Sequence, residues 1–217
     1  MIDVRNVSKD YHSETGHGYH RAVSDLSFAV QPGEKLAVLG RNGAGKSTLI
    51  RLLAGIEMPT LGTIDRTMSL SWPVGLSGGV GGSMTGHDNI RFISRLYNKP
   101  FKLMREYVED FAELGKFLAE PVRTYSAGMR ARLNFALSLA IDFDCYLIDE
   151  VIAVGDQRFQ RRSHYELFER RADRSLILAS HVPTVVKDYC SRALIMHHGR
   201  GKIFEDLDLA FDIYDDL

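Results

Sequence analysis

The sequence predicts an α/β fold with a parallel sheet at its core, an inserted helical subdomain and a small antiparallel β subdomain near the N-terminus. Short apolar runs at 34–39, 145–148 and 176–179 alternate with helical stretches, which is typical of parallel strands joined by right-handed crossovers. Three helical stretches occupy about residues 87–141, between two of these strands. Two strand-like segments precede the turn Gln31-Pro32-Gly33 and predict the antiparallel part.

The composition fits one domain spanning residues 1–217, because 45% of the 217 residues are apolar and can bury a sizeable core. The formal net charge is −1 and the basic residues are spread along the chain, which argues against nucleic acid as a partner. Cys145 and Cys190 lack the spacing of a metal or redox site, so we expect reduced thiols. With no signal-peptide pattern and no run of about 18 apolar residues, we expect a soluble protein that reaches a membrane through a partner.

The individual elements follow from local patterns along the chain. The first two strands are expected at 2–7 and 21–30, and the polar, glycine- and histidine-rich segment 9–19 between them predicts a loop that contains Tyr11. A glycine-rich loop is also expected at 73–86. The other expected strands are 34–39, 63–65, 68–72, 145–148, 176–179, 193–196 and 202–204, and the expected helices are 46–53, 88–98, 101–117, 126–141, 159–172 and one from 206.

One stretch matches G-x-x-x-x-G-K-[ST], the pattern of a phosphate-binding loop, and it lies between an apolar strand and a helix start, as such a loop should. Its glycines bring backbone N–H groups close to an anion, and the helix N-terminus adds partial positive charge. Lys46 can reach the β- and γ-phosphates and Ser47 can ligate Mg²⁺. A glycine-rich turn with a solvated lysine is the alternative. The expected phosphate site comprises Gly40, Arg41, Asn42, Gly43, Ala44, Gly45, Lys46, Ser47 and Thr48.

Two carboxylates follow the apolar strand at 145–148. In a phosphate-loop ATPase, Asp149 would hold Mg²⁺ through water and Glu150 would act as general base on the attacking water. The alternative is a solvated strand end.

A second helix is expected to start at Ser126, where the serine hydroxyl and the helix N–H groups could face a γ-phosphate. Gly128 would permit a close approach of the backbone to that ligand. The alternative is that Ser126 is simply an N-cap.

Two further side chains are candidates on weaker grounds. His181 follows another core strand, at the edge where α/β proteins place their sites, and could contact the γ-phosphate or position water. A satisfied structural histidine is the alternative. Tyr11 could stack on a purine, in which case phenylalanine should replace it almost silently, or it could be an ordinary loop aromatic.

These motifs together resemble the ATP-binding cassette (ABC) family, whose fold is a P-loop NTPase core. The stretch from Gly40 to Ser47 looks like its Walker A motif and Tyr146 to Asp149 like Walker B, followed by Glu150 as the catalytic glutamate. Tyr125 to Met129 looks like the signature motif, Ala153 to Asp156 like the D-loop and His181 like the switch histidine. The resemblance implies that the chain binds ATP with Mg²⁺, hydrolyses ATP and works as a homodimer.

Within that family, the chain is similar to the nucleotide-binding subunit of capsular-polysaccharide exporters. The resemblance rests on the phosphate loop and on Ser71-Trp72-Pro73, Gly82 to Gly86, Tyr125 to Met129 and Asp149 to Asp156. It implies a peripheral protein on the cytoplasmic face of the bacterial inner membrane, bound to an integral membrane permease that exports lipid-linked polysaccharide. The related O-antigen exporters often add a C-terminal carbohydrate-binding domain, and a chain that stops at Leu217 is expected to lack one, which favours capsule. Export of an O-antigen or teichoic-acid type of polysaccharide is the alternative.

The sequence also departs from the family pattern. The signature has Ala127 and Met129 where most cassettes have glycine and glutamine, and no glutamine occurs between Thr48 and Ser126 to serve as a Q-loop. Three other classes remain to be weighed. Non-transport ABC ATPases resemble longer proteins with coiled coils or tandem cassettes, and this sequence shows neither. A GTPase should carry the guanine-binding motif N-K-x-D, but Asn98-Lys99 is followed by Pro100-Phe101. A purely regulatory nucleotide-binding module would not need a general base such as Glu150.

Overall fold

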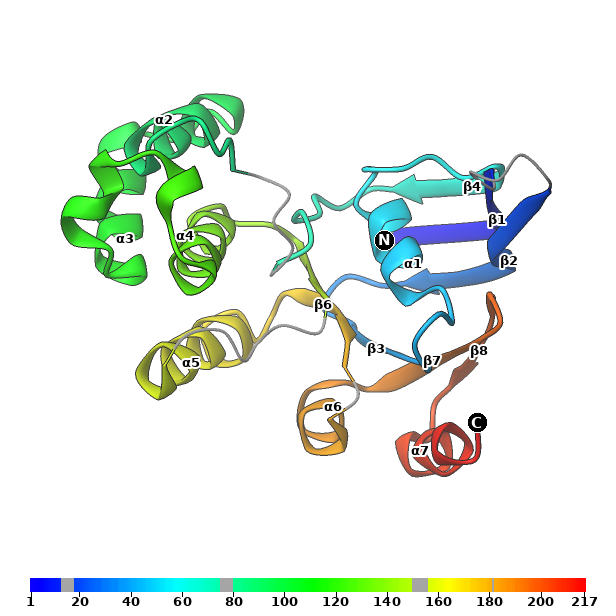
Figure 1. Ribbon diagram of the computed structural model, residues 1–217. Helices are drawn as coiled ribbons and strands as arrows, with labels where there is room; N and C mark the ends of the chain where they lie inside the picture. Colours follow the sequence, from blue (N-terminus) through cyan, green and yellow to red (C-terminus); the bar gives the residue numbers. More distant parts are fainter. Residues whose placement is uncertain (13–17, 75–79, 150–155, 181) are drawn as a thin grey trace. The chain divides into compact units, whose positions relative to one another are not determined.

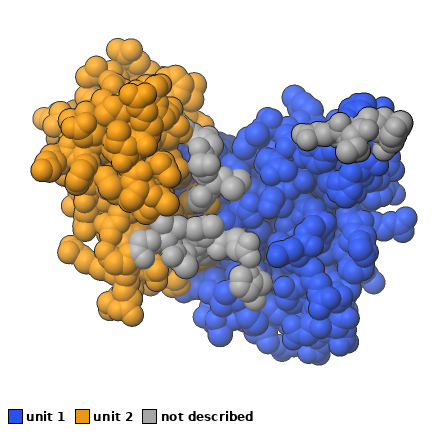
Figure 2. Space-filling model, viewed as in Figure 1, with its two compact units in different colours: residues 1–73, 143–150, 173–217 blue, residues 74–142, 151–172 orange. Residues whose placement is uncertain are grey.

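The computed structural model describes residues 1–12, 18–74, 80–149, 156–180 and 182–217 (Figure 1). The chain divides into two compact units (Figure 2). Unit 1 comprises residues 1–73, 143–150 and 173–217, and unit 2 comprises residues 74–142 and 151–172. The sequence of unit 1 is therefore interrupted twice by unit 2.

Unit 1 contains a three-stranded antiparallel sheet in the order β2-β1-β4, which is the predicted N-terminal β subdomain. Its strands are β1 (Ile2–His12), β2 (Tyr19–Val30) and β4 (Leu61–Arg66). The prediction that residues 9–12 belong to a loop is wrong, because β1 continues to His12 and Tyr11 pairs with His20 of β2. The residues at these strand ends are polar and either partly buried or exposed, and the register shifts between Lys9 and Asp10, so the sequence shows no apolar alternation there.

The second sheet of unit 1 has five strands in the order β5-β6-β3-β7-β8. Four of them are parallel, as predicted, and β8 is antiparallel to β7. Every residue of β5 and β6 is buried, which explains why these strands are continuous apolar runs in the sequence. The strands are β3 (Lys35–Leu39), β5 (Cys145–Asp149), β6 (Ser175–Ala179), β7 (Arg192–His197) and β8 (Arg200–Phe204).

Helix α1 (Lys46–Leu53) begins directly after the phosphate-loop sequence, as predicted. Its buried side chains pack in one hydrophobic core with residues of both sheets. That core joins Leu49, Ile50, Leu52 and Leu53 of α1 to Val4, Val23, Leu26, Leu36, Val38, Leu147, Ile177 and Leu194. Because each fully buried aliphatic side chain contributes about 1.5–3 kcal/mol, this core fixes α1 and therefore the position of its N-terminus.

Two parts of unit 1 differ from the sequence prediction or were not expected, and a third agrees with it. Residues 68–72 do not form a strand of a sheet. They are held to β5 by the bridge from Leu70 to Cys145 and by Ser71, whose hydroxyl accepts a bond of 2.9 Å from the Leu147 N–H. Helix α6 (Pro183–Tyr189) is seven residues long, too short to produce a periodic pattern. Helix α7 (Leu207–Asp215) starts after Asp206, near the expected residue.

Both cysteines are free and buried in unit 1, Cys145 in β5 and Cys190 directly after α6. Burial raises the pKa of each thiol to about 12, because the thiolate would lose its hydration. The expectation of two thiols outside any disulfide is therefore confirmed.

Unit 2 consists mainly of the helices α2 (Gly86–Leu96), α3 (Phe101–Ala112), α4 (Ala127–Leu139) and α5 (Gln157–His164). Helix α2 starts with a capping box, in which Thr85 and Asp88 bond reciprocally to each other's backbone N–H groups. Phe111, Phe135 and Phe159 pack together across α3, α4 and α5 with ring centroids 5.4–6.1 Å apart. Among the helices in the ranges given above, each is too short or too polar to cross a lipid bilayer.

Two helices of unit 2 end earlier than the sequence pattern predicts. Helix α3 stops at Ala112, because Glu113 adopts a left-handed conformation with φ of 53°, and the chain resumes as a 3₁₀ helix at Gly115–Ala119. Helix α5 passes at Tyr165 into a π-helical turn that ends at Glu169. In both places apolar residues continue at helical spacing although the backbone geometry changes.

Candidate functional site

The phosphate-loop sequence turns between β3 and α1 in a conformation that requires glycine. Gly45 caps α1 with a φ of 105°, and a Cβ there would lie 2.3 Å from the carbonyl oxygen of Ala22. Gly40 has a φ of 155°, and a Cβ there would lie 2.5 Å from the carbonyl oxygen of Met196. The two glycines therefore let the loop lie directly against the backbones of β2 and β7, with its own N–H groups at the start of α1.

Lys46 is the first residue of α1, and its side chain folds back over the loop. Its ammonium donates hydrogen bonds to the carbonyl oxygens of Gly40 at 2.5 Å and Arg41 at 3.2 Å. No acidic residue lies in the first turn of α1, so nothing there opposes an anion at the helix N-terminus. The arrangement brings a cation and the positive end of a helix dipole to one place.

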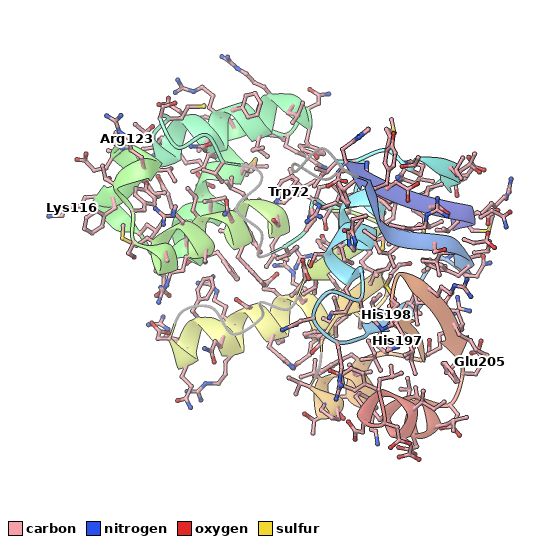
Figure 3. The ribbon with its side chains drawn as sticks, turned by 45° about the vertical axis from the view of Figure 1, so that its right-hand side comes forward. Trp72, Lys116, Arg123, His197, His198 and Glu205 are labelled. Carbon is pink, nitrogen blue, oxygen red and sulfur yellow. The ribbon has the colours of Figure 1, made fainter. Side chains whose placement is uncertain are left out.

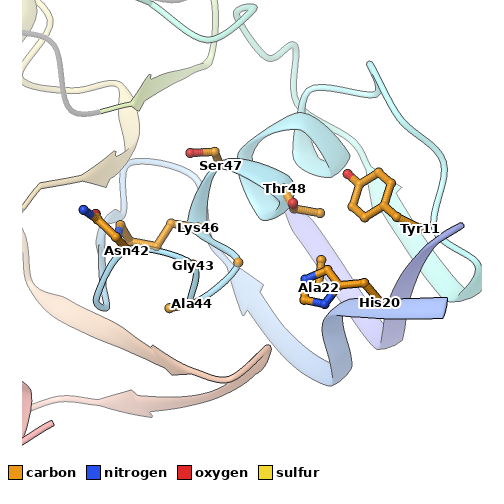
Figure 4. Close-up of a pocket in the computed structure, with 10 residues that line it drawn as sticks. Tyr11, His20, Ala22, Asn42, Gly43, Ala44, Lys46, Ser47 and Thr48 are labelled. Carbon is orange, nitrogen blue, oxygen red and sulfur yellow. The ribbon is translucent and has the colours of Figure 1, made fainter. Parts of the chain in front are cut away.

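A pocket of about 450 Å³ opens over this loop (Figure 4). Seven of the nine predicted phosphate-site residues line it, and Tyr11 lines it as well. The pocket is lined by Tyr11, His20, Ala22, Asn42, Gly43, Ala44, Gly45, Lys46, Ser47 and Thr48. Gly40 and Arg41 are not among these lining residues, but their carbonyl groups hold Lys46. The structure thus brings the phosphate loop and the candidate base-binding tyrosine to one cavity.

His20 and Ala22 line the pocket although the sequence analysis did not select them. Both lie on β2, and His20 pairs directly with Tyr11 on β1. The sequence could have indicated these residues only indirectly. If the first strand is expected to continue through Tyr11, the next strand must supply a pairing partner near His20, but the prediction of a loop at 9–19 implies no such partner.

The turn between β7 and β8 fixes the phosphate loop from another side. This turn carries His198 and Gly199, next to His197 at the end of β7 (Figure 3). The Gly199 N–H donates to the Ala44 carbonyl oxygen at 3.1 Å, and the Ser24 N–H donates to the Gly199 carbonyl oxygen at 2.8 Å. The main chain of one residue of the turn, Gly199, therefore connects the phosphate loop to β2.

The oxygen ligands that would suit Mg²⁺ also belong to unit 1. Ser47 is exposed at the start of α1, and the Asp149 side chain is buried at the end of β5. In the sheet order, one strand lies between β5 and β3, so the two candidate ligands follow the same edge of one sheet. Hydroxyl and carboxylate oxygens are the donors that Mg²⁺ prefers, and the residue types therefore fit this ion.

Glu150, His181 and most of the D-loop-like stretch lie outside the described residues. Asp156, the last residue of that stretch, caps α5 through a bond of 2.9 Å from the Phe159 N–H and pairs with Arg132 of α4. The pKa of the Asp156 carboxyl is lowered, mainly by the bond from the Phe159 N–H and also by Arg132, and these contacts outweigh its desolvation.

In unit 2, Ser126 is the N-cap of α4, and its oxygen accepts a bond of 3.2 Å from the Met129 N–H. The hydroxyl hydrogen is still available for donation to a ligand. Gly128 is exposed, and a Cβ there would meet nothing closer than the Ser126 oxygen at 4.0 Å. Packing within unit 2 therefore does not require glycine at this helical position.

Two glycines of unit 2 give a direct test, because there is room for a Cβ at Gly128 and no room for one at Gly86. Gly128→Ala should raise the free energy of unfolding by up to about 1 kcal/mol, because alanine favours helix and has room here. Gly86→Ala should lower it by about 1–3 kcal/mol, because the added Cβ would lie 2.7 Å from a Leu118 methyl group and 2.8 Å from the Tyr125 hydroxyl. Urea unfolding of both variants measures the difference. A loss of stability in Gly128→Ala would show that packing does demand this glycine.

A strand, a glycine loop, an α-helix and the adjoining sheet define a nucleotide-binding fold, and a model of the ABC transporter family matches residues 23–153. The chain belongs to the ABC transporter family.

Two curated relatives are similar over the whole chain. The capsule polysaccharide export ATP-binding protein CtrD of Neisseria meningitidis serogroup B is 55% identical and is covered over 100% of both chains. The ATP-binding protein BexA of Haemophilus influenzae is 54% identical, with 100% of this chain and 99% of BexA covered.

Among solved structures, a dimeric ATP-binding cassette in a post-hydrolysis state with ADP and Pi superposes with a TM-score of 0.79. The match covers 94% of this chain and 98% of that chain at 17% identity, so it bears on the fold alone. It confirms the predicted ABC ATPase fold.

Proposed function

We propose that this chain is the ATP-hydrolysing subunit of an ABC transporter that exports lipid-linked capsular polysaccharide. The single observation that supports this most is the identity of 55% to CtrD over the full length of both proteins. The residues 1–217 would form one ABC ATPase domain, with an inserted helical subdomain at about 87–141. The chain would sit on the cytoplasmic face of the bacterial inner membrane, attached through an integral membrane permease.

Teichoic acid export is the second candidate. The teichoic acids export ATP-binding protein TagH of Bacillus anthracis is 37% identical over 92% of this chain, but the match covers only 37% of TagH. The lower identity, 37% against 55% for CtrD, favours capsule export as the function of this chain.

The pocket geometry supports a specific assignment of roles. The N–H groups at the start of α1 and the Lys46 ammonium would neutralise the β- and γ-phosphates of ATP, after Lys46 exchanges its bonds with Gly40 and Arg41 for bonds to phosphate. Tyr11 would receive the base. Ser47 and Asp149 would hold Mg²⁺, which supplies charge neutralisation at the phosphates when it is bound.

Hydrolysis would depend on Glu150 as the general base, because it follows Asp149 at a strand end, and on His181 to contact the γ-phosphate or position water. Ser126 and Gly128 would close the site from a second copy of the chain. Two helix N-termini, at Lys46 and Ser126, then face one γ-phosphate from opposite sides.

Substituting the proposed base should separate binding from turnover. Glu150→Gln should bind ATP normally but hydrolyse it slower by about 10²-fold or more, since a positioned base contributes at least that factor. Lys46→Ala is the comparison variant and should bind no ATP while remaining folded by circular dichroism. Near-normal turnover of Glu150→Gln in the assembled transporter would contradict the assignment of the base.

The transported substrate can be tested in a cell. The chain, expressed in a Neisseria meningitidis strain that lacks CtrD, should restore capsular polysaccharide to the cell surface, because the two proteins are 55% identical throughout. Surface polysaccharide is measured with a capsule-specific antibody, and Lys46→Ala serves as the inactive control. If a chain that assembles with the permease and hydrolyses ATP left the polysaccharide inside the cell, capsule export would be the wrong substrate assignment.

Sharing of ATP between two chains can be tested by mixing defective copies. In a dimer of Lys46→Ala with Gly128→Asp, one site carries both lesions and the other carries neither, so the mixed dimer should trap about one ATP per pair. Each variant alone should trap none, because the aspartate adds bulk and negative charge beside the γ-phosphate. Trapped nucleotide is counted after rapid gel filtration. A site complete within one chain would gain nothing from mixing.

A further inference from the structure

A carboxylate outside the predicted motifs organises the base-binding end of the pocket. Glu57 lies between α1 and β4, and one of its oxygens accepts the Tyr11 hydroxyl at 2.5 Å. The Lys9 ammonium lies 3.4 Å from this same oxygen, and the other oxygen of Glu57 accepts the Arg51 Nε–H at 2.6 Å. Three side chains from two elements therefore converge on this one carboxylate.

The contacts fix both the position of the Tyr11 ring and the face that it offers. The hydroxyl is held by Glu57, while the Lys9 ammonium lies over the ring, 5.2 Å from its centroid. Tyr11 lines the pocket, and Lys9 is not among the described residues that do so. One face of the ring is thus taken by a cation outside the pocket, and the opposite face is the one available to a flat ligand.

The same carboxylate connects this tyrosine to the phosphate end of the pocket. Arg51 lies on α1, one turn after Thr48, and its Nη2 group lies 3.3 Å from the Thr48 hydroxyl and 3.4 Å from the Tyr11 hydroxyl. Desolvation would raise the pKa of Glu57, but the bonds from Tyr11 and Arg51 outweigh it and lower that pKa, so the carboxylate stays ionised at neutral pH. The base end and the phosphate end are therefore joined by side chains of fixed charge.

We propose that Glu57 is a positioning residue for the nucleotide base: it holds the Tyr11 ring, through the tyrosine hydroxyl, at a fixed distance from the phosphate-binding helix. The inference rests on the proposed function, in which the pocket binds ATP. It changes one expectation from the sequence. If the ring acted by stacking alone, phenylalanine would replace Tyr11 almost silently, but a ring that is positioned by its hydroxyl should bind the base less well once that hydroxyl is removed.

A double-mutant cycle on the purified full-length chain tests this link. Dissociation constants for ATP and for inorganic tripolyphosphate, which carries the phosphates but no base, are measured by calorimetry. Tyr11→Phe and Glu57→Ala should each weaken ATP binding about three- to tenfold, the range expected for one hydrogen bond. In a chain that already carries Tyr11→Phe, adding Glu57→Ala should change ATP binding less than about twofold, because the contact is already lost. Tripolyphosphate binding should change less than about twofold throughout.

A matched control is available at the other end of β3. Glu34 is also a partly buried carboxylate paired with an arginine, with side-chain exposure of 15% against 22% for Glu57, and it pairs with Arg192. Glu34→Ala should leave the ATP dissociation constant unchanged even if it lowers the melting temperature. Glu57→Gln replaces Glu57→Ala if the latter fails to fold, since the amide cannot accept from both Tyr11 and Arg51.

The outcomes separate this inference from the function on which it rests. The inference is overturned if the fold-effects of the two substitutions on the ATP dissociation constant multiply, or if tripolyphosphate binding falls as much as ATP binding. Glu57 would then act through Arg51 and Thr48 on the phosphate end of the pocket. If the unsubstituted chain binds no ATP, the proposed function itself fails. A third outcome is that the unsubstituted chain binds ATP, Lys46→Ala abolishes that binding, and Tyr11→Phe and Glu57→Ala act independently of each other. This outcome would support the proposed function and overturn only the role of Glu57.

Discussion

The structure of unit 1 depends on a close backbone approach at Ala22. The carbonyl oxygen of this residue faces Gly45 of the phosphate loop and Gly199 of the turn between β7 and β8, and neither position leaves ordinary room for a Cβ, which would lie 2.3 Å and 3.0 Å away. β2 of one sheet, a hairpin of the other sheet and the start of α1 therefore meet through main-chain atoms. Because main chain has few alternative conformations compared with side chains, this junction sets the position of the Lys46 end of α1 more firmly than side-chain packing alone.

The core explains why α1 can tolerate such a constraint at its first turn. Its apolar side chains are buried together with residues from both sheets, so the helix is held along its length while the loop is held at its start. An eight-residue helix is too short to be stable by itself, and this burial supplies what the isolated segment lacks. The local sequence predicts the helix because its apolar positions coincide with the face that the tertiary structure buries.

The sequence predicts those parts of the structure whose conformation is determined by a single local pattern of residues. The phosphate loop is recognisable from Gly40 to Thr48 because backbone freedom and charge act within nine residues, and buried β5 and β6 are visible as apolar runs. Glu57 was not predictable, because its role depends on Tyr11, 46 residues away, and on the continuation of β1 through polar residues. Residues 68–72 include apolar side chains like a strand, but they are joined to β5 by an isolated bridge and a bond to the Ser71 side chain and not by a continuous ladder. No periodicity distinguishes the two outcomes.

Neither native thiol is a good nucleophile, and this makes the chain suitable for site-directed labelling. With Cys145 and Cys190 both buried and their pKa raised to about 12, the thiolate fraction at neutral pH is about 10³-fold or more below that of an ordinary exposed cysteine. A single cysteine introduced on an exposed position would therefore react with a maleimide or a spin label far faster than either native residue. Probes could then report on the separation of the two units during a catalytic cycle without first removing side chains that pack beside β5 and α6.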